Sequence, residues 1–158
     1  MNRLKTIIAT IAIAHAPAIG SAQDGRRELR LEECPRPVQA AVQDNARGGR
    51  IDDVDLIMIE GRQIYVAEVD LPRDRELKIY IAGNGSLMKT IEEILLSELP
   101  ETVRDAAQAL GPVEDVDKET SGQTLTYHVE IDRKGRADLE VVFSADGMIL
   151  KQTEEAKD

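Results

Sequence analysis

The sequence is poor in the residues that most often build catalytic, metal and disulfide sites. Its 158 residues include one cysteine, two histidines, one phenylalanine, three tyrosines and no tryptophan. A lone cysteine cannot form an internal disulfide, even in an oxidising compartment. The chain also lacks a glycine-rich phosphate loop, a nucleophile elbow and the cysteine–histidine spacing typical of zinc. These absences disfavour the common enzyme classes and require a core built mainly of aliphatic side chains.

The first residues have the layout of a signal peptide. Arg3 and Lys5 supply the positive start, an apolar run covers residues 7–14, and small residues end the segment at Ala22. The run is shorter than the roughly 20 residues that a membrane-spanning helix needs. We therefore expect cleavage after Ala22, export to the periplasm or the medium, and no membrane insertion of the mature chain. An uncleaved amphipathic anchor is the alternative.

The mature chain is strongly acidic. Removal of residues 1–22 leaves 18 basic and 30 acidic residues and a net charge of −12. Negative charge repels phosphate backbones and anionic lipid, which makes nucleic acids and membrane surfaces poor partners. It attracts cationic proteins or metal ions, although it also serves simply to solvate a surface. Cys34 is either a structural thiol or the site of an intermolecular disulfide, which would make a dimer.

The sequence repeats itself at an interval of 62 residues. "YVAEVD" at 65–70 recurs as "YHVEID" at 127–132, and the run from Leu77 matches the run from Leu139 without a gap. Self-similarity of this length indicates a tandem duplication. The predicted organisation is a signal peptide at 1–22, an amino-terminal segment at 23–34, a first repeat at 35–93, a linker at 94–98 and a second repeat at 99–155.

Each copy has the pattern of one helix followed by three strands. Apolar residues recur at helical spacing before each strand region, and two-residue alternation then places Tyr65 and Tyr127 on the inner face. Asn84-Gly85 and Asp146-Gly147 predict tight turns of the primed type, with positive φ at both positions. Residues 91–98 are expected to be a short helix or an extended linker. The expected fold class is α+β: a tandem duplication of an α-β-β-β unit, with antiparallel sheet or sheets covered by helices.

Several of these motifs resemble the PepSY-like family of small exported bacterial domains, which are also described as β-lactamase-inhibitor-like. The resemblance rests on "LPETVRDAAQAL" from Leu99, on "YHVEID" and on the final hairpin "ADGMIL". The first copy departs from it, with Cys34 where the second has Leu99. The resemblance implies an antiparallel sheet packed by helices and a role in binding or restraining peptidases or other envelope proteins. It implies no catalytic residues.

Two sets of side chains on the predicted outer face of the sheet are candidate binding residues. The first strand of copy one is apolar on both faces, whereas its counterpart is polar. An exposed apolar patch of this size marks a partner site, unless the amino-terminal segment, the other copy or a second molecule covers it. The candidate partner surface is Ile57, Ile59, Val66 and Tyr80. The candidate acidic strand face is Glu68, Asp70, His128, Glu130 and Asp132.

No catalytic or metal site emerges from these residues. Glu68 and Glu130 would have to face each other across a cleft to act as acid and base, and a single histidine is a poor metal site. The acidic run at 51–55 lacks the spacing of an EF-hand calcium loop. We therefore expect a non-catalytic exported protein, without cofactor, that binds or inhibits a peptidase or other envelope protein. The alternative is a small-ligand or cation-binding protein, calcium in particular, of the cell envelope.

Overall fold

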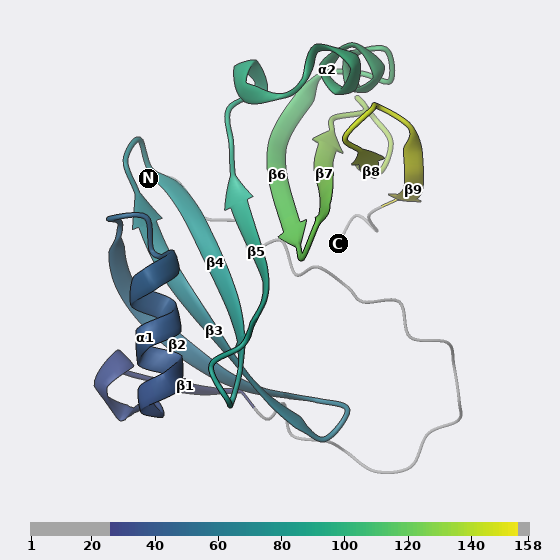
Figure 1. Ribbon diagram of the computed structural model, residues 1–158. Coiled ribbons are helices and arrows are strands. Elements are labelled where there is room, and N and C mark those ends of the chain that lie inside the picture. Colours follow the sequence, from purple (N-terminus) through teal and green to yellow (C-terminus); the bar gives the residue numbers. More distant parts are fainter. Residues whose placement is uncertain (1–25, 155–158) are drawn as a thin grey trace.

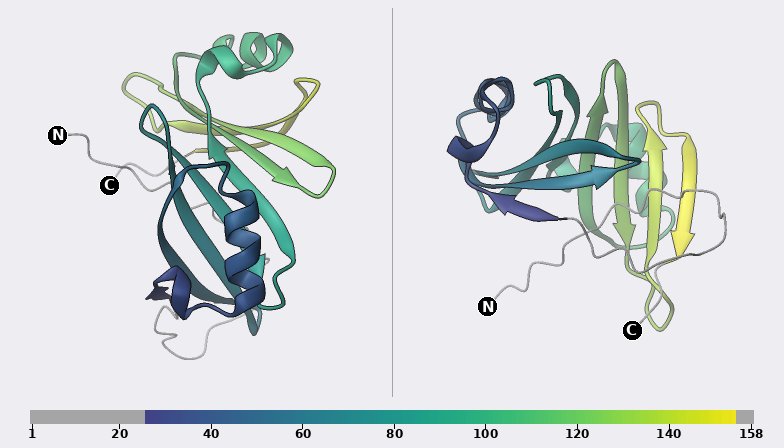
Figure 2. Two further views of the ribbon diagram at one scale, coloured as in Figure 1. Left: turned by 60° about the vertical axis from the view of Figure 1, so that its left-hand side comes forward. Right: turned by 90° about the horizontal axis from the view of Figure 1, so that it is seen from below.

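The computed structural model describes residues 26–154, which form one antiparallel sheet of nine strands (Figure 1). The strands lie in the sheet in chain order. The sheet twists strongly, so the strands of the two halves run in different directions (Figure 2). The predicted signal peptide at 1–22 lies outside the described residues, as does the end of the second repeat at 155. No helix among the described residues is long and apolar enough to cross a membrane.

Both halves have the same order of elements. A 3₁₀ helix, an α-helix and four strands follow one another in each half, and one further short strand precedes them. The elements are β1 (Arg27–Leu29), η1 (Leu31–Glu33), α1 (Arg36–Asn45), β2 (Arg50–Ile59), β3 (Arg62–Leu71), β4 (Arg75–Ala82), β5 (Leu87–Glu93), η2 (Leu96–Glu98), α2 (Glu101–Gln108), β6 (Val113–Ser121), β7 (Thr124–Ile131), β8 (Leu139–Ser144) and β9 (Ile149–Glu154).

The expected α+β fold, a tandem of α-β-β-β units covered by helices, is wrong. The described chain is mainly one continuous sheet, and its two α-helices have only 10 and 8 residues. Each half contributes four strands rather than three. Residues 91–93, expected in a helix or linker, belong to β5 and pair with β6. The edge strand of a separate first unit would leave backbone N–H and C=O groups unpaired. In the structure the second edge of β5 pairs with β6, and this pairing merges the two halves.

All the helical elements of the described chain pack against one face of the sheet, which we call the helix face (Figure 1). Directly paired residues of neighbouring strands point to the same side of a sheet. Leu77 pairs with Glu92, Glu92 with Lys118, and Lys118 with Tyr127, so all four side chains lie on the helix face. Apolar side chains form two separate cores there. The first contains Val38, Val42, Val54, Tyr65, Ala67, Val69, Leu77, Ile79 and Ile81; the second contains Val103, Ala107, Val116, Tyr127, Val129, Ile131, Val141 and Phe143.

An ion cluster occupies the helix face between the two cores. Glu92 of β5 is 7% exposed, and its carboxylate lies 2.5 Å from Arg47 Nη1 and 2.8 Å from Lys118 Nζ. Arg75 Nη1 lies 4.0 Å from Glu92 and 3.1 Å from Glu98. Burial acts to raise the pKa of Glu92, but Lys118 and Arg47 outweigh it and the pKa is lowered. The cluster therefore connects the loop after α1 and strand β4 of the first half to β6 and η2 of the second.

The hairpin turns differ from the predicted primed type. Gly85 and Gly147 have φ values of 87° and 89°, but neither Asn84 nor Asp146 has a positive φ. The Gly85 N–H instead donates to the Ala82 carbonyl at 2.8 Å. This is the three-residue hairpin loop in which only the last position is left-handed, a position that suits glycine.

Glu92→Gln should lower the free energy of unfolding by about 1 to 3 kcal/mol, because two half-exposed cations lose their shared buried partner. Urea unfolding measures the loss. Since the folded-state pKa of Glu92 is lowered from 4.5, its contribution is complete above that pH and is lost as the pH falls through the folded-state value. The difference between wild type and variant should therefore shrink in acid.

Glu154→Gln is the matched control. Glu154 occupies the corresponding place in β9 and is exposed, and its one ion pair with another described residue is with Arg133, at 2.9 Å. Its substitution should cost less than about 1 kcal/mol. Equal losses in the two variants would refute a special role of Glu92 in joining the halves.

Candidate binding face of the sheet

The side of the sheet opposite the helix face carries none of the described helices, and we call it the open face. Its residues alternate along each strand with the core residues. They come from β2 to β4 in the first half and from β6 to β8 in the second, with β5 between them. Because the halves form one sheet, the open face is continuous from one half to the other.

The predicted partner surface lies on the open face of the first half. Ile57 pairs with Ile64, and Val66 pairs with Tyr80, so side chains from three strands lie together. The surface is less exposed than expected: Val66 is 7% exposed and Ile64 is buried, whereas Ile57, Ile59 and Tyr80 are half-buried. Ile64 was missed by the sequence analysis, although its alternation with Val66 places it on the same side. We call these five residues the apolar patch.

A row of linked polar side chains crosses the open face beside the apolar patch. Lys89 Nζ lies 4.8 Å from the centre of the Tyr80 ring and 3.0 Å from Glu119. Glu119 lies 3.6 Å from His128 Nε2, and His128 Nδ1 lies 3.4 Å from Glu140. The row extends from β4 to β8 and therefore joins the open faces of the two halves.

Elsewhere on the open face, carboxylates stand directly opposite carboxylates on neighbouring strands. Like charges in directly opposed positions destabilise a sheet. The three opposed pairs are Asp70–Glu76, Glu93–Asp117 and Glu130–Glu140. The middle pair was missed by the sequence analysis, because it exists only where β5 meets β6.

Asp117 is the carboxylate with the most perturbed titration on this face. Burial raises its pKa to about 6, and the nearby Glu93 and Asp115 act in the same direction, while His128 and Lys78 oppose them. No ion pair or hydrogen bond to its carboxylate is found among residues 26–154. Asp117 is therefore a half-buried acid on the open face, and none of the cations at positions 26–154 contacts it.

The predicted acidic strand face does not form one cluster. Glu68 is half-buried on β3, where burial raises its pKa. Asp70 and Glu130 belong to opposed carboxylate pairs at opposite ends of the open face, and His128 belongs to the polar row. Asp132 lies just beyond the end of β7.

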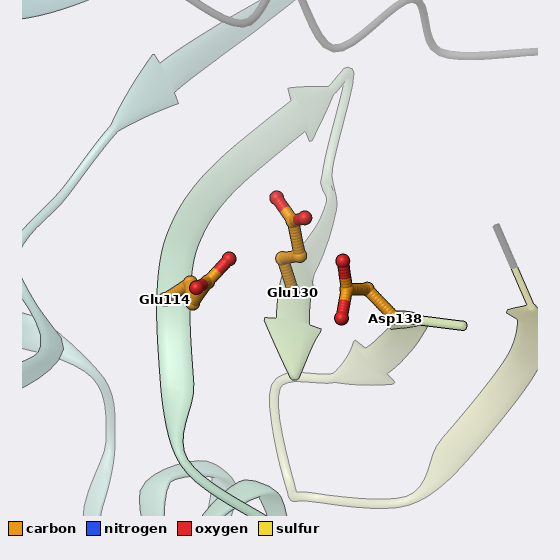
Figure 3. Close-up of side chains that lie close together, drawn as sticks. All are labelled: Glu114, Glu130 and Asp138. Carbon is orange, nitrogen blue, oxygen red and sulfur yellow. The ribbon is translucent and has the colours of Figure 1, made fainter. Parts of the chain in front are cut away.

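Three carboxylates meet at one end of the second half (Figure 3). Glu114 of β6, Glu130 of β7 and Asp138, just before β8, have ligand oxygens within 4.8 Å of one another. Glu114 is exposed, Asp138 is half-buried and Glu130 is 8% exposed. Clustered carboxylate oxygens are the ligands that calcium prefers, although acidic side chains also gather without an ion. The acidic run at 51–55 takes no part in this cluster.

Cys34 is buried in the first core beside η1. It is 4% exposed, and burial raises the pKa of its thiol. A buried, protonated thiol reacts slowly. The disulfide-linked dimer expected from the sequence would require this segment to open, and it stays a prediction.

Comparison with known proteins finds likeness in fold. No family model matches the chain, and no curated protein matches its sequence. A protein from Bacteroides eggerthii described as periplasmic has a TM-score of 0.63 at 16% identity, over 77% of this chain and 88% of its own. A DUF2874 family protein from Bacteroides uniformis has a TM-score of 0.63 at 20% identity, over 77% and 89%. A BLIP-like protein from Bacteroides fragilis has a TM-score of 0.59 at 18% identity, over 79% and 90%.

At these identities the likeness shows the fold alone. The chain has the fold of the BLIP-like and DUF2874 proteins. The β-lactamase-inhibitor-like part of the sequence resemblance agrees with this fold, and the PepSY-like assignment stays a prediction.

Asp117→Asn should raise the free energy of unfolding at pH 8 by about 1 to 3 kcal/mol. The folded-state pKa lies above the ordinary 3.8, so the ionised carboxylate penalises the folded wild type above about pH 6. The penalty fades as the pH falls from about 6 to below 3.8. Urea unfolding at pH 8 and pH 4 should show a large gain and a small one. Asp115→Asn, at an exposed position on the same strand, should change little at either pH.

Proposed function

We propose that this chain is an exported, non-catalytic binding protein that holds a peptidase or another envelope protein against the open face of its sheet. The observation that supports it best is the make-up of that face. A half-buried apolar patch lies beside charged rows on the side of the sheet that no described helix covers. An apolar centre with a polar surround is the usual anatomy of a protein interface.

Export is supported from two directions. The first 22 residues have the layout of a signal peptide, and a structurally similar protein is described as periplasmic. The chain is exported to the periplasm or secreted. The motifs quoted above favour a PepSY-like assignment within the BLIP-like fold.

The non-catalytic part of the proposal is supported by the positions of the carboxylates. Glu68 and Glu130, the pair that acid–base chemistry would need, lie on β3 and β7, four strands apart in the sheet. Each is opposed by residues of its neighbouring strands, Lys78 and Glu140. Catalysis requires its acid and base to meet at one bond, and this arrangement favours a surface for contact.

Lysine substitutions in the apolar patch should abolish partner capture. Ile57→Lys and Ile59→Lys each place a charge in the proposed contact, so recovery of partners from envelope extract should fall at least about tenfold. Tagged protein serves as bait, and quantitative mass spectrometry of the captured proteins gives the recovery.

Met58→Lys is the matched control for these two variants. Met58 lies between the two isoleucines on β2, points to the opposite side and is 52% exposed. It should capture the same proteins as the wild type. Equal capture by all three variants would remove the open face as the binding surface.

A second candidate function is cation binding at the carboxylate cluster of Glu114, Glu130 and Asp138, favoured by the convergence of these three side chains from separate segments. On this function, calcium should release or absorb heat in calorimetry and raise the melting temperature. Asp138→Asn should raise the dissociation constant for calcium at least about tenfold, whereas Asp44→Asn on α1 should leave it unchanged. No heat and no thermal shift with the wild type would remove this candidate.

A further inference from the structure

The open face places four carboxylates in a line across the strands that join the halves. The opposed pairs Asp70–Glu76 and Glu93–Asp117 provide them. Leu77 pairs with Glu92, so Glu76 and Glu93 are the next residues along β4 and β5 and stand level with each other. Neighbouring strands lie about 4.8 Å apart, so this acidic line spans roughly 15 Å of the sheet.

The cations of the open face are already engaged beside this line. Arg50 forms an ion pair with Asp70, Lys78 Nζ lies 2.9 Å from Glu76, and Lys89 Nζ lies 3.0 Å from Glu119. His128 stands opposite Asp117 on β7, but its two ring nitrogens face Glu119 and Glu140. In the described chain Glu93 and Asp117 thus stand opposite each other, and no cation contacts either carboxylate.

Such a pair of like charges lowers the stability of the protein when no partner is bound. Sequences specify a fold best when every local choice supports it, and real proteins depart from that consistency mainly at functional sites. The departure here lies on the surface proposed for partner binding, four residues along the strands, or roughly 13 Å, from the level of Val66 and Tyr80 in the apolar patch.

We infer that the partner presents basic side chains to the acidic line, with aliphatic side chains beside them that contact the apolar patch. This inference rests on the proposed function and adds the chemistry of the partner. The charge of the open face supports a cationic protein as its occupant, because positive and negative surfaces attract and orient each other. A second copy of this chain, which has a net charge of −10 over its full length, would oppose carboxylates to carboxylates. Nucleic acid and anionic lipid would be repelled in the same way.

The probe is a blocked octapeptide of four arginines followed by four valines, so that both kinds of side chain can reach the same face of the sheet. It is titrated into isotope-labelled protein at pH 7.5. In NMR spectra we expect changes in amide chemical shift that are concentrated on β3 to β7. The dissociation constant should rise with salt concentration. Glu93→Gln and Asp117→Asn should each weaken binding at least about fivefold, because a charge-assisted contact is lost. A peptide with glutamate in place of arginine should not bind.

Two variants on the helices control for net charge. Asp44→Asn on α1 and Glu101→Gln on α2 make the same charge change at exposed positions away from the open face. They should change the dissociation constant less than about twofold. Equal weakening by all four variants, or shifts spread over the whole protein, would mean attraction by net charge alone and would overturn the inference. The stability of the Asp117→Asn variant shows independently that any loss of binding is not a loss of folding.

The same variants separate failure of this inference from failure of the proposed function. If Ile57→Lys abolishes capture of an envelope protein while Glu93→Gln and Asp117→Asn leave that capture unchanged, the function stands and a basic partner is excluded. If Ile57→Lys and Met58→Lys capture equally, the open face is not the binding surface, and both proposals fail.

Discussion

The pairing of β5 with β6 makes one body of two halves, and the Glu92 ion cluster holds the helix face of that junction. Four residue pairs connect the strands, while Arg47 and Lys118 approach Glu92 from different halves. A unit of about 60 residues buries too little of its surface to be stable by itself. Because the two cores remain separate, backbone pairing and buried charge at the junction supply the continuity that apolar packing does not.

The same short strand determines the character of both faces. Successive residues of a strand point to opposite sides, so Glu92 enters the ion cluster and Glu93 stands on the open face against Asp117. One carboxylate is held by two cations, and its neighbour opposes another carboxylate. The charges at the junction are therefore paired with opposite charges on the helix face, whereas on the open face, the side proposed for binding, like charges stand against each other.

The two halves share their irregularities as well as their elements. A register shift interrupts β2 at Ile51/Val54 and β6 at Val113/Val116, positions that are 62 residues apart. Their open faces have nevertheless diverged. The first half shows Ile57 and Val66 where the second shows Glu119 and His128. This asymmetry gives the open face an apolar part and a charged part, which two identical copies would not provide.

Local periodicity was enough to predict the two helices, the hairpin positions and the burial of Tyr65 and Tyr127, because these depend on residues close in sequence. The expected α+β tandem was wrong, because periodicity cannot show whether the edge of one unit pairs with the next. The meeting of Glu130 with Glu114 and Asp138, and the opposition of Glu93 to Asp117, likewise depend on the register between strands. Register is set by the pairing of the whole sheet, so only the tertiary structure decided which of the many carboxylates face each other.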